Sequence, residues 1–295
     1  MTCPVCGSAT TDPLGSRQSD LFPGRAYALR RCPDCRFAFV ADPCTDFARL
    51  YDEAYYHGRG ADPLVDYAFE QDHPDRTVRR YEWRGLTRVA RALLGKLTPA
   101  TRWLDFGCGN GGLVRYVRDH VGCTIVGHDT GWATTRARDM GLPILGEDEL
   151  DGLKGSLDLV TAVEVIEHVP DPVAVLRRVR GLLRPGGVLL LTTGNAEPFR
   201  GRLLDWGYVR PDIHVSYFEP QTLARALRAA GFEVEHRGFL PGHADVIRFK
   251  VLKNLRVRQA GGWERLVPWP VVSRAVDRRY RVTAHPIGRV PNPPP

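Results

Sequence analysis

Long apolar runs are missing from this 295-residue sequence. A helix that spans a bilayer needs roughly 20 consecutive apolar residues, whereas the run VLLL at 188–191 is typical of a buried strand. The first residues, MTCPVCGSAT, also lack the basic region and apolar core of a secretory signal. These absences exclude a membrane-spanning helix on sequence grounds, and we expect a cytoplasmic protein.

Lysine is scarce, so arginine carries nearly all of the positive charge. The net charge of +7 is unevenly placed. From Val246 to the end, eleven basic residues face two acids, Glu264 and Asp277, so this segment carries +9 and the rest of the chain carries −2. A local excess of this kind favours a polyanionic or phosphate-bearing partner, although a solvated surface would give the same composition.

Four of the seven cysteines form two pairs with the spacing C-x2-C-x25-C-x2-C: Cys3, Cys6, Cys32 and Cys35. Such pairs provide four thiolates for tetrahedral zinc, and a site closed by four protein ligands leaves no position for a substrate. Disulfides are disfavoured in the cytosol, and two pairs in one short module favour a metal over a redox pair. We therefore predict a structural Zn²⁺ ion in a zinc-ribbon-like module over residues 1–40.

Beyond residue 100, strand-like apolar runs alternate with amphipathic segments. Strands are predicted at 101–107, 123–129, 143–146, 157–165, 188–193 and, as the last strand, 233–239; helices are predicted at 111–121, 131–140, 170–183 and 220–232. This alternation predicts an α/β protein with a doubly wound, mostly parallel sheet. We expect a helical lid or linker at 41–98, a ligand-binding domain at 99–240, and a basic C-terminal extension at 241–295 with a disordered proline-rich end.

The first predicted strand of this domain leads into the loop GCGNGG at 107–112, with Asp105 two residues ahead of it. In a doubly wound sheet, ligands bind beyond the carboxyl ends of the strands. The loop departs from the dinucleotide pattern G-x-G-x-x-G, and the carboxylate of Asp105 would repel a pyrophosphate but suit a cationic sulfonium. This favours S-adenosylmethionine (SAM) over NAD. Asp129, about 20 residues past the loop, has the spacing at which a carboxylate binds ribose hydroxyls.

The motifs LDFGCGNGG, GHD, LDLVTAVEVIEHVPDP and LLRPGG, in this order, resemble those of the class I SAM-dependent methyltransferases. The EVIEHVPDP stretch is most similar to ubiquinone-biosynthesis methyltransferases and to bacterial sugar and natural-product methyltransferases. The resemblance implies a Rossmann-like, seven-stranded sheet and SAM as cofactor. It also implies these cofactor contacts: Asp105, Gly107, Gly109 and the backbone of Cys108 near the methionine part, Asp129 at the ribose, Glu147 or Asp148 near the adenine, and Glu164 and Val165 in the pocket wall.

The cysteine module followed by LYDEAYYHGRG resembles the start of zinc-bearing sugar C-methyltransferases. In those enzymes, tyrosines of this stretch approach cofactor and substrate, which makes Tyr51, Tyr55 and above all Tyr56 candidates here; packing of the lid is the alternative. A later stretch, HVSYF from His214, is also similar, but Ile213 stands where those enzymes carry glutamate. C-methylation of a nucleotide sugar is therefore not favoured.

Two histidines are the catalytic candidates. His214 follows VRP in a loop expected at the pocket mouth, and imidazole titrates near neutral pH, so it can accept a proton from a hydroxyl or an amine. His168, in the IEHVPDP turn, is either functional or part of the pocket wall. Methyl transfer by SN2 displacement often needs only proximity and alignment, so a base is not obligatory.

Three functions fit these observations. The favoured one is methyl transfer to a small molecule, such as a bacterial natural-product, sugar or glycan precursor, which could carry a phosphate or nucleotide. The second is an RNA methyltransferase that grips nucleic acid with the zinc module and the basic extension. It is less favoured because few aromatic residues interleave with the basic ones and the N/D-P-P-Y/F motif is absent. The third is a SAM-binding scaffold without catalysis, which the complete motif set disfavours. The acceptor atom and the oligomeric state are left open.

Overall fold

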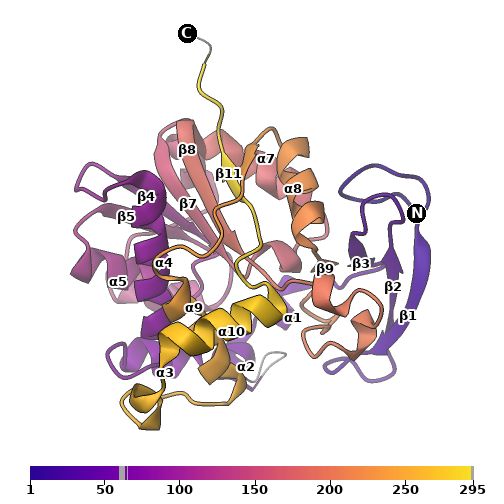
Figure 1. The fold of residues 1–295 in the computed structure, drawn as a ribbon, viewed down its shortest axis with the longest axis horizontal. Coiled ribbons are helices and arrows are strands. Elements are labelled where there is room, and N and C mark those ends of the chain that lie inside the picture. Colours follow the sequence, from indigo (N-terminus) through magenta and orange to yellow (C-terminus); the bar gives the residue numbers. More distant parts are fainter. Residues whose placement is uncertain (60–63, 65, 294–295) are drawn as a thin grey trace.

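The computed structural model of the chain describes residues 1–59, 64 and 66–293 (Figure 1). It shows a seven-stranded sheet between layers of helices and, to one side, a four-stranded sheet near the N-terminus. The predicted α/β class is thereby confirmed.

The central sheet has the strand order β10-β11-β8-β7-β4-β5-β6. The bounds are β4 (Arg102–Phe106), β5 (Thr124–His128), β6 (Ile144–Leu145), β7 (Leu157–Val163), β8 (Leu183–Thr192), β10 (Glu233–Glu235) and β11 (Ile287–Arg289). Strand β11 is antiparallel to both of its neighbours, and the other pairings are parallel. The chain first extends the sheet from β4 to β5 and β6 and then crosses back to β7. The carboxyl end of β4 therefore lies at the switch point where such sheets bind ligands.

Side chains of the buried strands alternate between two helical layers, as the pleat of a sheet requires. On one face, Leu189 and Leu191 of β8 belong to a core that includes α7 (Pro172–Leu182) and α8 (Pro220–Ala229). On the other face, Val188 and Leu190 belong to a core with the following helices: α4 (Arg79–Leu94), α5 (Gly112–His120) and α6 (Ala133–Asp139). Both faces of the parallel sheet are thus covered, which explains its near-continuous apolar strands.

The segment predicted as a helical lid or linker, 41–98, contains α4 and, before it, three short helices: α1 (Phe47–Leu50), α2 (Glu53–Tyr56) and α3 (Tyr67–Asp72). Each short helix begins at an aspartate whose carboxylate accepts a hydrogen bond from a backbone N–H of the first turn: Asp46, Asp52 and Asp66. The cap at Asp52 separates α2 from α1, because an N-cap residue has a non-helical backbone.

The N-terminal sheet has the order β1-β2-β3-β9, with β1 (Asp12–Gln18), β2 (Ala26–Arg31), β3 (Ala38–Val40) and β9 (Ser216–Tyr217). Strands β1, β2 and β3 all lie within the module predicted over residues 1–40. Strand β9 lies far along the chain, in the segment between β8 and α8, and it pairs with β3: Phe39 is opposite Ser216. The hydroxyl of Thr222 on α8 also donates to the carbonyl of Cys35 at 2.7 Å. The cysteine module is therefore packed into the larger domain.

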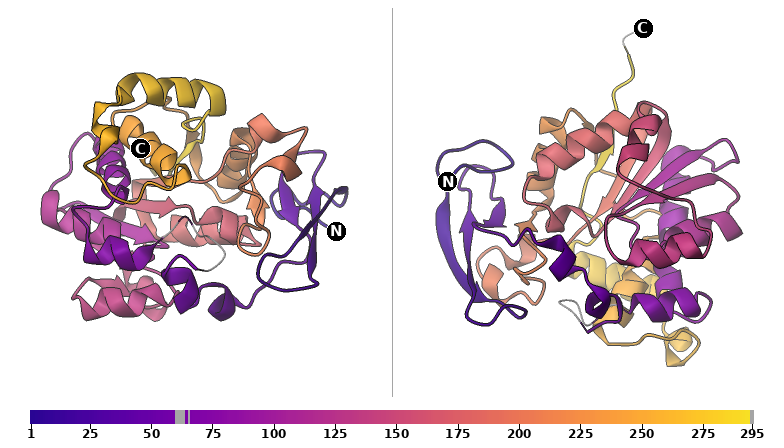
Figure 2. Two further views of the ribbon diagram at one scale, coloured as in Figure 1. Left: turned by 90° about the horizontal axis from the view of Figure 1, so that it is seen from below. Right: turned by 180° about the vertical axis from the view of Figure 1, so that it is seen from behind.

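The C-terminal extension completes the central sheet. Helix α9 (His243–Asn254) packs against α4, and α10 (Trp269–Tyr280) packs against α9 (Figure 2). The prediction that 233–239 is the last strand is wrong, because β11 inserts between β10 and β8. The proline-rich end is also not uniformly disordered: Val290 is buried, and its N–H donates to the carbonyl of Gly187 at 2.9 Å. Residues 294–295 lie outside the described residues. A three-residue strand, IGR, has too few residues to show a periodicity.

Short 3₁₀ helices lie at Asp148–Leu153 (η1), Ile166–His168 (η2), Glu197–Phe199 (η3), Leu203–Asp205 (η4) and Trp263–Leu266 (η5). In the part of the chain that the structure describes, no helix combines the length and apolar character needed to cross a bilayer.

Candidate active site

The loop after β4 depends on glycine. Gly107 and Gly109 have φ angles of +77° and +53°, in the left-handed region that favours glycine. A Cβ at Gly107 would lie 2.3 Å from Cγ2 of Val165, so no side chain fits there without displacing Val165. Cys108 is buried, and its side chain packs in the core with α4 and α5. Its backbone alone can therefore contribute to a ligand site.

Asp129 hydrogen-bonds this loop, and Asp105 lies just ahead of it in β4. The carboxylate of Asp129 accepts hydrogen bonds from the N–H of Gly109 at 2.9 Å and from the N–H of Gly131 at 2.7 Å. Asp105 is buried and accepts a hydrogen bond from the hydroxyl of Thr161 at 2.7 Å. Burial raises the pKa of Asp105 to about 7, although the Thr161 hydrogen bond opposes this shift. A cation bound beside Asp105 would favour its ionised form.

The acidic residues after β6 lie at the predicted edge of the sheet. Glu147 is half exposed; it forms an ion pair with Arg178 of α7, and its carboxylate lies 3.3 Å from Nε2 of His128. Asp148 is exposed at the start of η1. Their contact with an adenine remains a prediction.

Lid tyrosines bridge the glycine loop and the histidines. The hydroxyl of Tyr51 lies 2.8 Å from Nδ1 of His168. The ring of Tyr51 meets that of Tyr55 edge-on at 5.0 Å between centroids, and Tyr55 lies 6.0 Å from Tyr67. Tyr67 in turn lies over Gly109, 3.6 Å from the position a Cβ would occupy there. The lid thus forms a continuous aromatic cover from β4 to η2.

Tyr56 is buried and is connected to the loop through Gln71. Its hydroxyl hydrogen-bonds the side-chain carbonyl of Gln71, whose amide donates to the carbonyl of Asn110 at 2.8 Å. The ring of Tyr56 contacts that of Trp132 at 4.9 Å between centroids, just after Asp129 in the chain. Tyr56 is therefore placed at the edge of the glycine loop, and its contact with a cofactor stays a prediction.

Two glutamates of the EVIEH motif share a tyrosine at the end of β7. The hydroxyl of Tyr208 lies 2.5 Å from a carboxylate oxygen of Glu167 and 3.2 Å from one of Glu164. Burial, reinforced by the charge of Glu164, raises the pKa of Glu167 to about 8, against the opposing hydrogen bond from Tyr208. Glu167 therefore carries a proton at neutral pH.

Glu164 has the opposite protonation preference. Burial alone would raise its pKa, but the ammonium of Lys250, 2.7 Å away, outweighs burial and holds the pKa well below its usual range. The carboxylate also accepts a hydrogen bond from the hydroxyl of Thr192 at 3.1 Å. Its backbone φ is +54°, an uncommon value for a residue with a side chain. The two glutamates are thus a neutral and a charged carboxyl held by one tyrosine.

The candidate bases, His168 and His214, lie together beside Glu167. Nδ1 of His214 lies 2.7 Å from the carbonyl of Tyr208, and Nδ1 of His168 lies 2.9 Å from the carbonyl of Ile213. A carbonyl can only accept, so we assign the proton of each ring to Nδ1 and the lone pair to Nε2. The two rings are 5.0 Å apart. One ligand atom each of Glu167, His168 and His214 lies within 4.8 Å of the others, a donor set that suits a divalent transition metal.

The four predicted zinc ligands converge in the N-terminal module. Sγ of Cys3 lies 3.5 Å from Sγ of Cys35, and Sγ of Cys6 lies 3.5 Å from Sγ of Cys32. All four sulfurs lie within 4.8 Å of one another. These separations are far beyond a disulfide bond of about 2.05 Å. They are close to the edge of roughly 3.8 Å that a tetrahedron with Zn–S bonds of about 2.3 Å requires.

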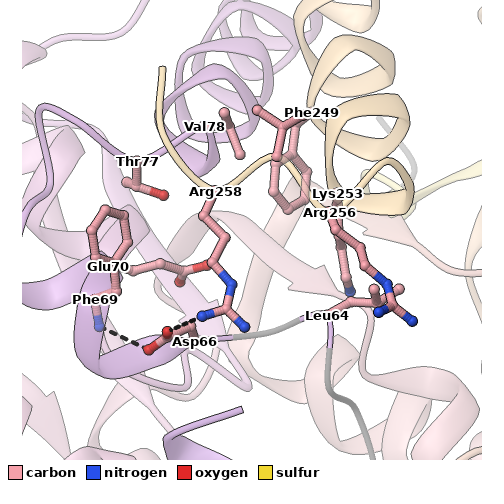
Figure 3. Close-up of a pocket in the computed structure, with 11 residues that line it drawn as sticks. Leu64, Asp66, Phe69, Glu70, Thr77, Val78, Phe249, Lys253, Arg256 and Arg258 are labelled. Carbon is pink, nitrogen blue, oxygen red and sulfur yellow. Dashed lines mark hydrogen bonds and ion pairs between the residues drawn. The ribbon is translucent and has the colours of Figure 1, made fainter. Parts of the chain in front are cut away.

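A cavity lies beside the lid, between α3, α4 and α9. It encloses about 580 Å³ of empty space, part of it open to solvent. Phe69, Val78 and Phe249 form apolar walls, while Arg256 and Arg258 contribute cationic groups (Figure 3).

Several functional residues could not be found from the sequence. Tyr208 and Lys250 lie far along the chain from Glu164, in segments without a recognisable motif. Glu167 was visible within EVIEH, but no spacing rule told which of the two glutamates faces the histidines. The predicted pair of His168 and His214 was separated by 46 positions and is brought together by the fold.

Comparison with known proteins supplies an independent view of this arrangement. A family profile described as a methyltransferase domain matches residues 76–237. The ubiquinone biosynthesis O-methyltransferase of Aeromonas salmonicida is 30% identical over 196 residues, which is 60% of this chain and 79% of the relative. The corresponding protein of Xanthomonas axonopodis pv. citri is 33% identical over 162 residues, or 48% of this chain and 66% of the relative, so the chain spans just under two thirds of that protein.

Among solved structures, phosphoethanolamine N-methyltransferase 2 of Haemonchus contortus in complex with SAM aligns with a TM-score of 0.50 at 16% identity. The alignment covers 85% of this chain and 61% of that protein. At this identity the likeness concerns the fold alone.

Proposed function

The chain belongs to the SAM-dependent methyltransferases, and we propose that it methylates a hydroxyl group of a small-molecule acceptor, with His214 as the general base. The acceptor class is supported by the curated relatives, whose names state O-methyl transfer in ubiquinone biosynthesis. The observation that supports His214 as the general base is the hydrogen bond between its Nδ1 and the carbonyl of Tyr208. This hydrogen bond turns the basic nitrogen, Nε2, away from the backbone.

The glycine loop fits the cofactor by its backbone. Gly107 and Gly109 keep the loop free of side chains, and Asp129 lies at the end of β5, where a carboxylate can accept hydrogen bonds from ribose hydroxyls. Asp105, with a pKa of about 7, is poised to ionise beside a positive charge. Tyr56 and Tyr67 would cover the cofactor on the side of the lid. When bound, SAM supplies an electrophilic methyl carbon on a sulfonium.

In the proposed reaction SAM would supply the methyl group: an acceptor oxygen would bond to the methyl carbon as the carbon–sulfur bond breaks, and the electron pair of that bond would stay on sulfur. Nε2 of His214 takes the hydroxyl proton. Glu167, neutral at pH 7, does not compete for that proton, and its burial keeps the site poor in water. His168 holds the lid through Tyr51 and positions it over the reacting groups. Most of the rate enhancement comes from alignment of the oxygen with the carbon–sulfur bond.

A second way to activate the acceptor is favoured by the donor set itself. Glu167, His168 and His214 could bind a divalent cation, which would lower the pKa of a coordinated hydroxyl. The Nδ1 hydrogen bonds to backbone carbonyls are the outer contacts that metal-binding histidines usually make. In this case Glu167 would lose its proton on binding the cation, and His214 would be a ligand rather than a base.

The test uses purified protein, methyl-tritiated SAM and an extract from a host that lacks the gene. Label in the small-molecule fraction would support the proposal, whereas label in RNA would show that the acceptor is RNA and not a small molecule. His214→Ala should lower transfer by about 10²–10⁴-fold, the usual contribution of a general base, and His120→Ala, an exposed histidine on α5, is the matched control. Activity that is lost on dialysis against a chelator and restored by Mg²⁺ or Mn²⁺ would select the metal mechanism.

We also propose that the four cysteines bind a structural Zn²⁺ ion. The sulfur separations support this, as does the packing of Cys3, Cys32 and Cys35 in the same core as α8. Elemental analysis should find one zinc ion per chain, lost in Cys32→Ser but retained in Cys123→Ser, a buried cysteine outside the module. Protein that binds no zinc and remains fully folded would contradict this assignment.

A further inference from the structure

The C-terminal extension exposes an unusual amount of apolar surface. Nine large hydrophobic side chains are exposed among the described residues, and five lie between residues 255 and 280. Their exposed fractions are 59% for Leu255, 56% for Trp263, 88% for Leu266, 67% for Val271 and 44% for Tyr280. A monomeric protein rarely concentrates such residues without an interaction that covers them.

The same segment is strongly cationic. Seven arginines are exposed between residues 255 and 281: Arg256, Arg258, Arg265, Arg274, Arg278, Arg279 and Arg281. Both acids of the segment are turned inward. Glu264 is buried and accepts a hydrogen bond from Tyr81, and Asp277 accepts hydrogen bonds from the backbone and the hydroxyl of Thr283. We call residues 255–281 the basic apolar surface, since it exposes arginine and apolar side chains but no acid.

Inward-facing contacts hold this surface in place. Trp269 is buried and donates from its indole N–H to the carbonyl of Glu264 at 2.6 Å. Ser273 is also buried and donates to the carbonyl of Ala244 on α9 at 3.0 Å. Trp269 and Ser273 thus fix the inner side of α10, and Val271 is left on an exposed side. The apolar side chains are exposed by the folded structure and are not a consequence of a loose terminus.

We propose that the basic apolar surface docks onto an anionic lipid membrane. Apolar side chains that include tryptophan and leucine, set among arginines, are the combination that holds a protein in the interfacial region of a bilayer. Arginines at this position are attracted to anionic headgroups. Binding of a nucleic acid would explain the exposed arginines and, through base stacking, Trp263 or Tyr280. It would not explain why Leu266, which is 88% exposed, and Val271 are also on the surface.

Docking would bring the cavity beside the lid to the membrane. Arg256 and Arg258 belong to both features, and the apolar side chain of Phe249 also lines the cavity (Figure 3). The protein would then rest on the bilayer by one face. This proposal concerns location and is independent of the acceptor that the enzyme methylates.

The test is co-sedimentation of the full chain with vesicles of phosphatidylcholine, alone or with 30% phosphatidylglycerol, in 0.1 M and 0.5 M salt. We expect binding to the anionic vesicles and at least tenfold weaker binding to the neutral ones or at high salt. Trp263→Ser/Leu266→Ser and Arg278→Ala/Arg279→Ala should each weaken binding at least tenfold. Arg177→Ala/Arg228→Ala, which removes exposed arginines of α7 and α8, is the matched control and should bind like the parent.

A second readout separates insertion from adsorption. Lipids brominated near the headgroup should quench tryptophan fluorescence of the parent chain, and most of this quenching should be lost in Trp263→Phe although that variant still binds. Equal binding to neutral and anionic vesicles, or no binding to either, would overturn the proposal. RNA binding without vesicle binding would assign the surface to nucleic acid, and a self-association abolished by Trp263→Ser/Leu266→Ser would assign it to a second copy of the chain. The methyl-transfer assay is unaffected by these outcomes, so the two proposals fail separately.

Discussion

Replacing Lys250 with methionine tests whether the charge on Glu164 is held by a single partner. The two groups are 2.7 Å apart, and each side chain is only about a quarter exposed. The methionine keeps most of the aliphatic volume of lysine but removes the ammonium. The carboxylate of Glu164 would then retain the hydrogen bonds from Thr192 and Tyr208 but only the weaker influence of the charge on Lys253.

The expected magnitude lies between two limits. Breaking a fully buried ion pair costs about 3–5 kcal/mol, because a charge is left uncompensated, whereas an exposed pair contributes about 0–1 kcal/mol. We expect Lys250→Met to lower the free energy of unfolding by about 2 kcal/mol at pH 7.5, roughly midway between these limits, because the pair is partly exposed and Glu164 keeps two hydrogen bonds. Lys154→Met removes a well-exposed partner of Asp151 and should cost less than about 0.5 kcal/mol.

The sign of the pH dependence follows from the lowered pKa of Glu164. A carboxyl whose folded-state pKa lies below its unfolded value stabilises the fold above the unfolded pKa, and this stability is lost as the pH falls through the folded value. The difference between the parent and Lys250→Met should therefore be full at pH 7.5 and shrink toward pH 4, where the unpaired Glu164 of the variant becomes protonated. Urea unfolding at pH 7.5, 6 and 5 measures this.

The double variant Lys250→Met/Glu164→Gln separates charge from packing. Glutamine removes the uncompensated charge, so the double variant should recover most of the stability lost in Lys250→Met. A loss that is independent of pH and persists in the double variant would show that the lysine stem, rather than the ion pair, stabilises this region. That result would refute the charge assignment for Glu164.

Three further predictions use the same unfolding assay. Gly107→Ala should lower the free energy of unfolding by about 2–4 kcal/mol, because the new Cβ would clash with Val165 and the backbone φ is positive. Gly122→Ala has a similar φ but open space around the new Cβ, so it should lower the free energy of unfolding by only about 1 kcal/mol. Equal losses would show that Val165 moves aside freely. The folded-state pKa of Glu167 is raised to about 8, so its contribution to stability is full below the ordinary value of about 4.5 and is lost as the pH rises toward 8. Glu167→Gln should therefore gain stability relative to the parent from pH 6 to 8, by up to about 2–3 kcal/mol, and keep a constant difference above pH 8; a difference that is already constant between pH 6 and 8 would contradict the raised pKa. Truncation before Ile287 should sharply reduce the soluble yield and the unfolding midpoint, because it removes β11 and exposes the edges of β8 and β10; a stable truncated protein would mean that β11 is dispensable.

The parts of the fold that the sequence predicted are those encoded by local patterns. The apolar runs of β7 and β8 have the length of buried parallel strands, and the glycine loop and Asp129 follow strand ends at short, recognisable spacings. The cysteine pairs are equally local, because each pair lies on one tight turn. The placement of the candidate cofactor residues at the carboxyl edge of the sheet follows from the same pattern.

The parts that escaped prediction depend on long-range contacts. Strand β11 pairs with β8 across about 100 positions of sequence, and its three residues have no periodicity of their own. The protonation states of Glu164 and Glu167 are likewise set by Lys250 and Tyr208, which no motif connects to them. Two identical side chains three positions apart acquire opposite charge states only through the fold.

The C-terminal extension therefore cannot be treated as a removable appendage. Lys250 of α9 reaches Glu164 in the candidate active site, and β11 completes the sheet, while the residues between them form the basic apolar surface. A deletion of the extension would disturb the site, the sheet and the surface at once, so loss of activity or of membrane binding in such a deletion would assign neither role. Only substitutions of outward-facing side chains, such as Trp263 and Leu266, change the surface while leaving Lys250 and β11 in place. The structural role of the extension and its proposed membrane binding can thus be separated by changing side chains but not by deleting segments.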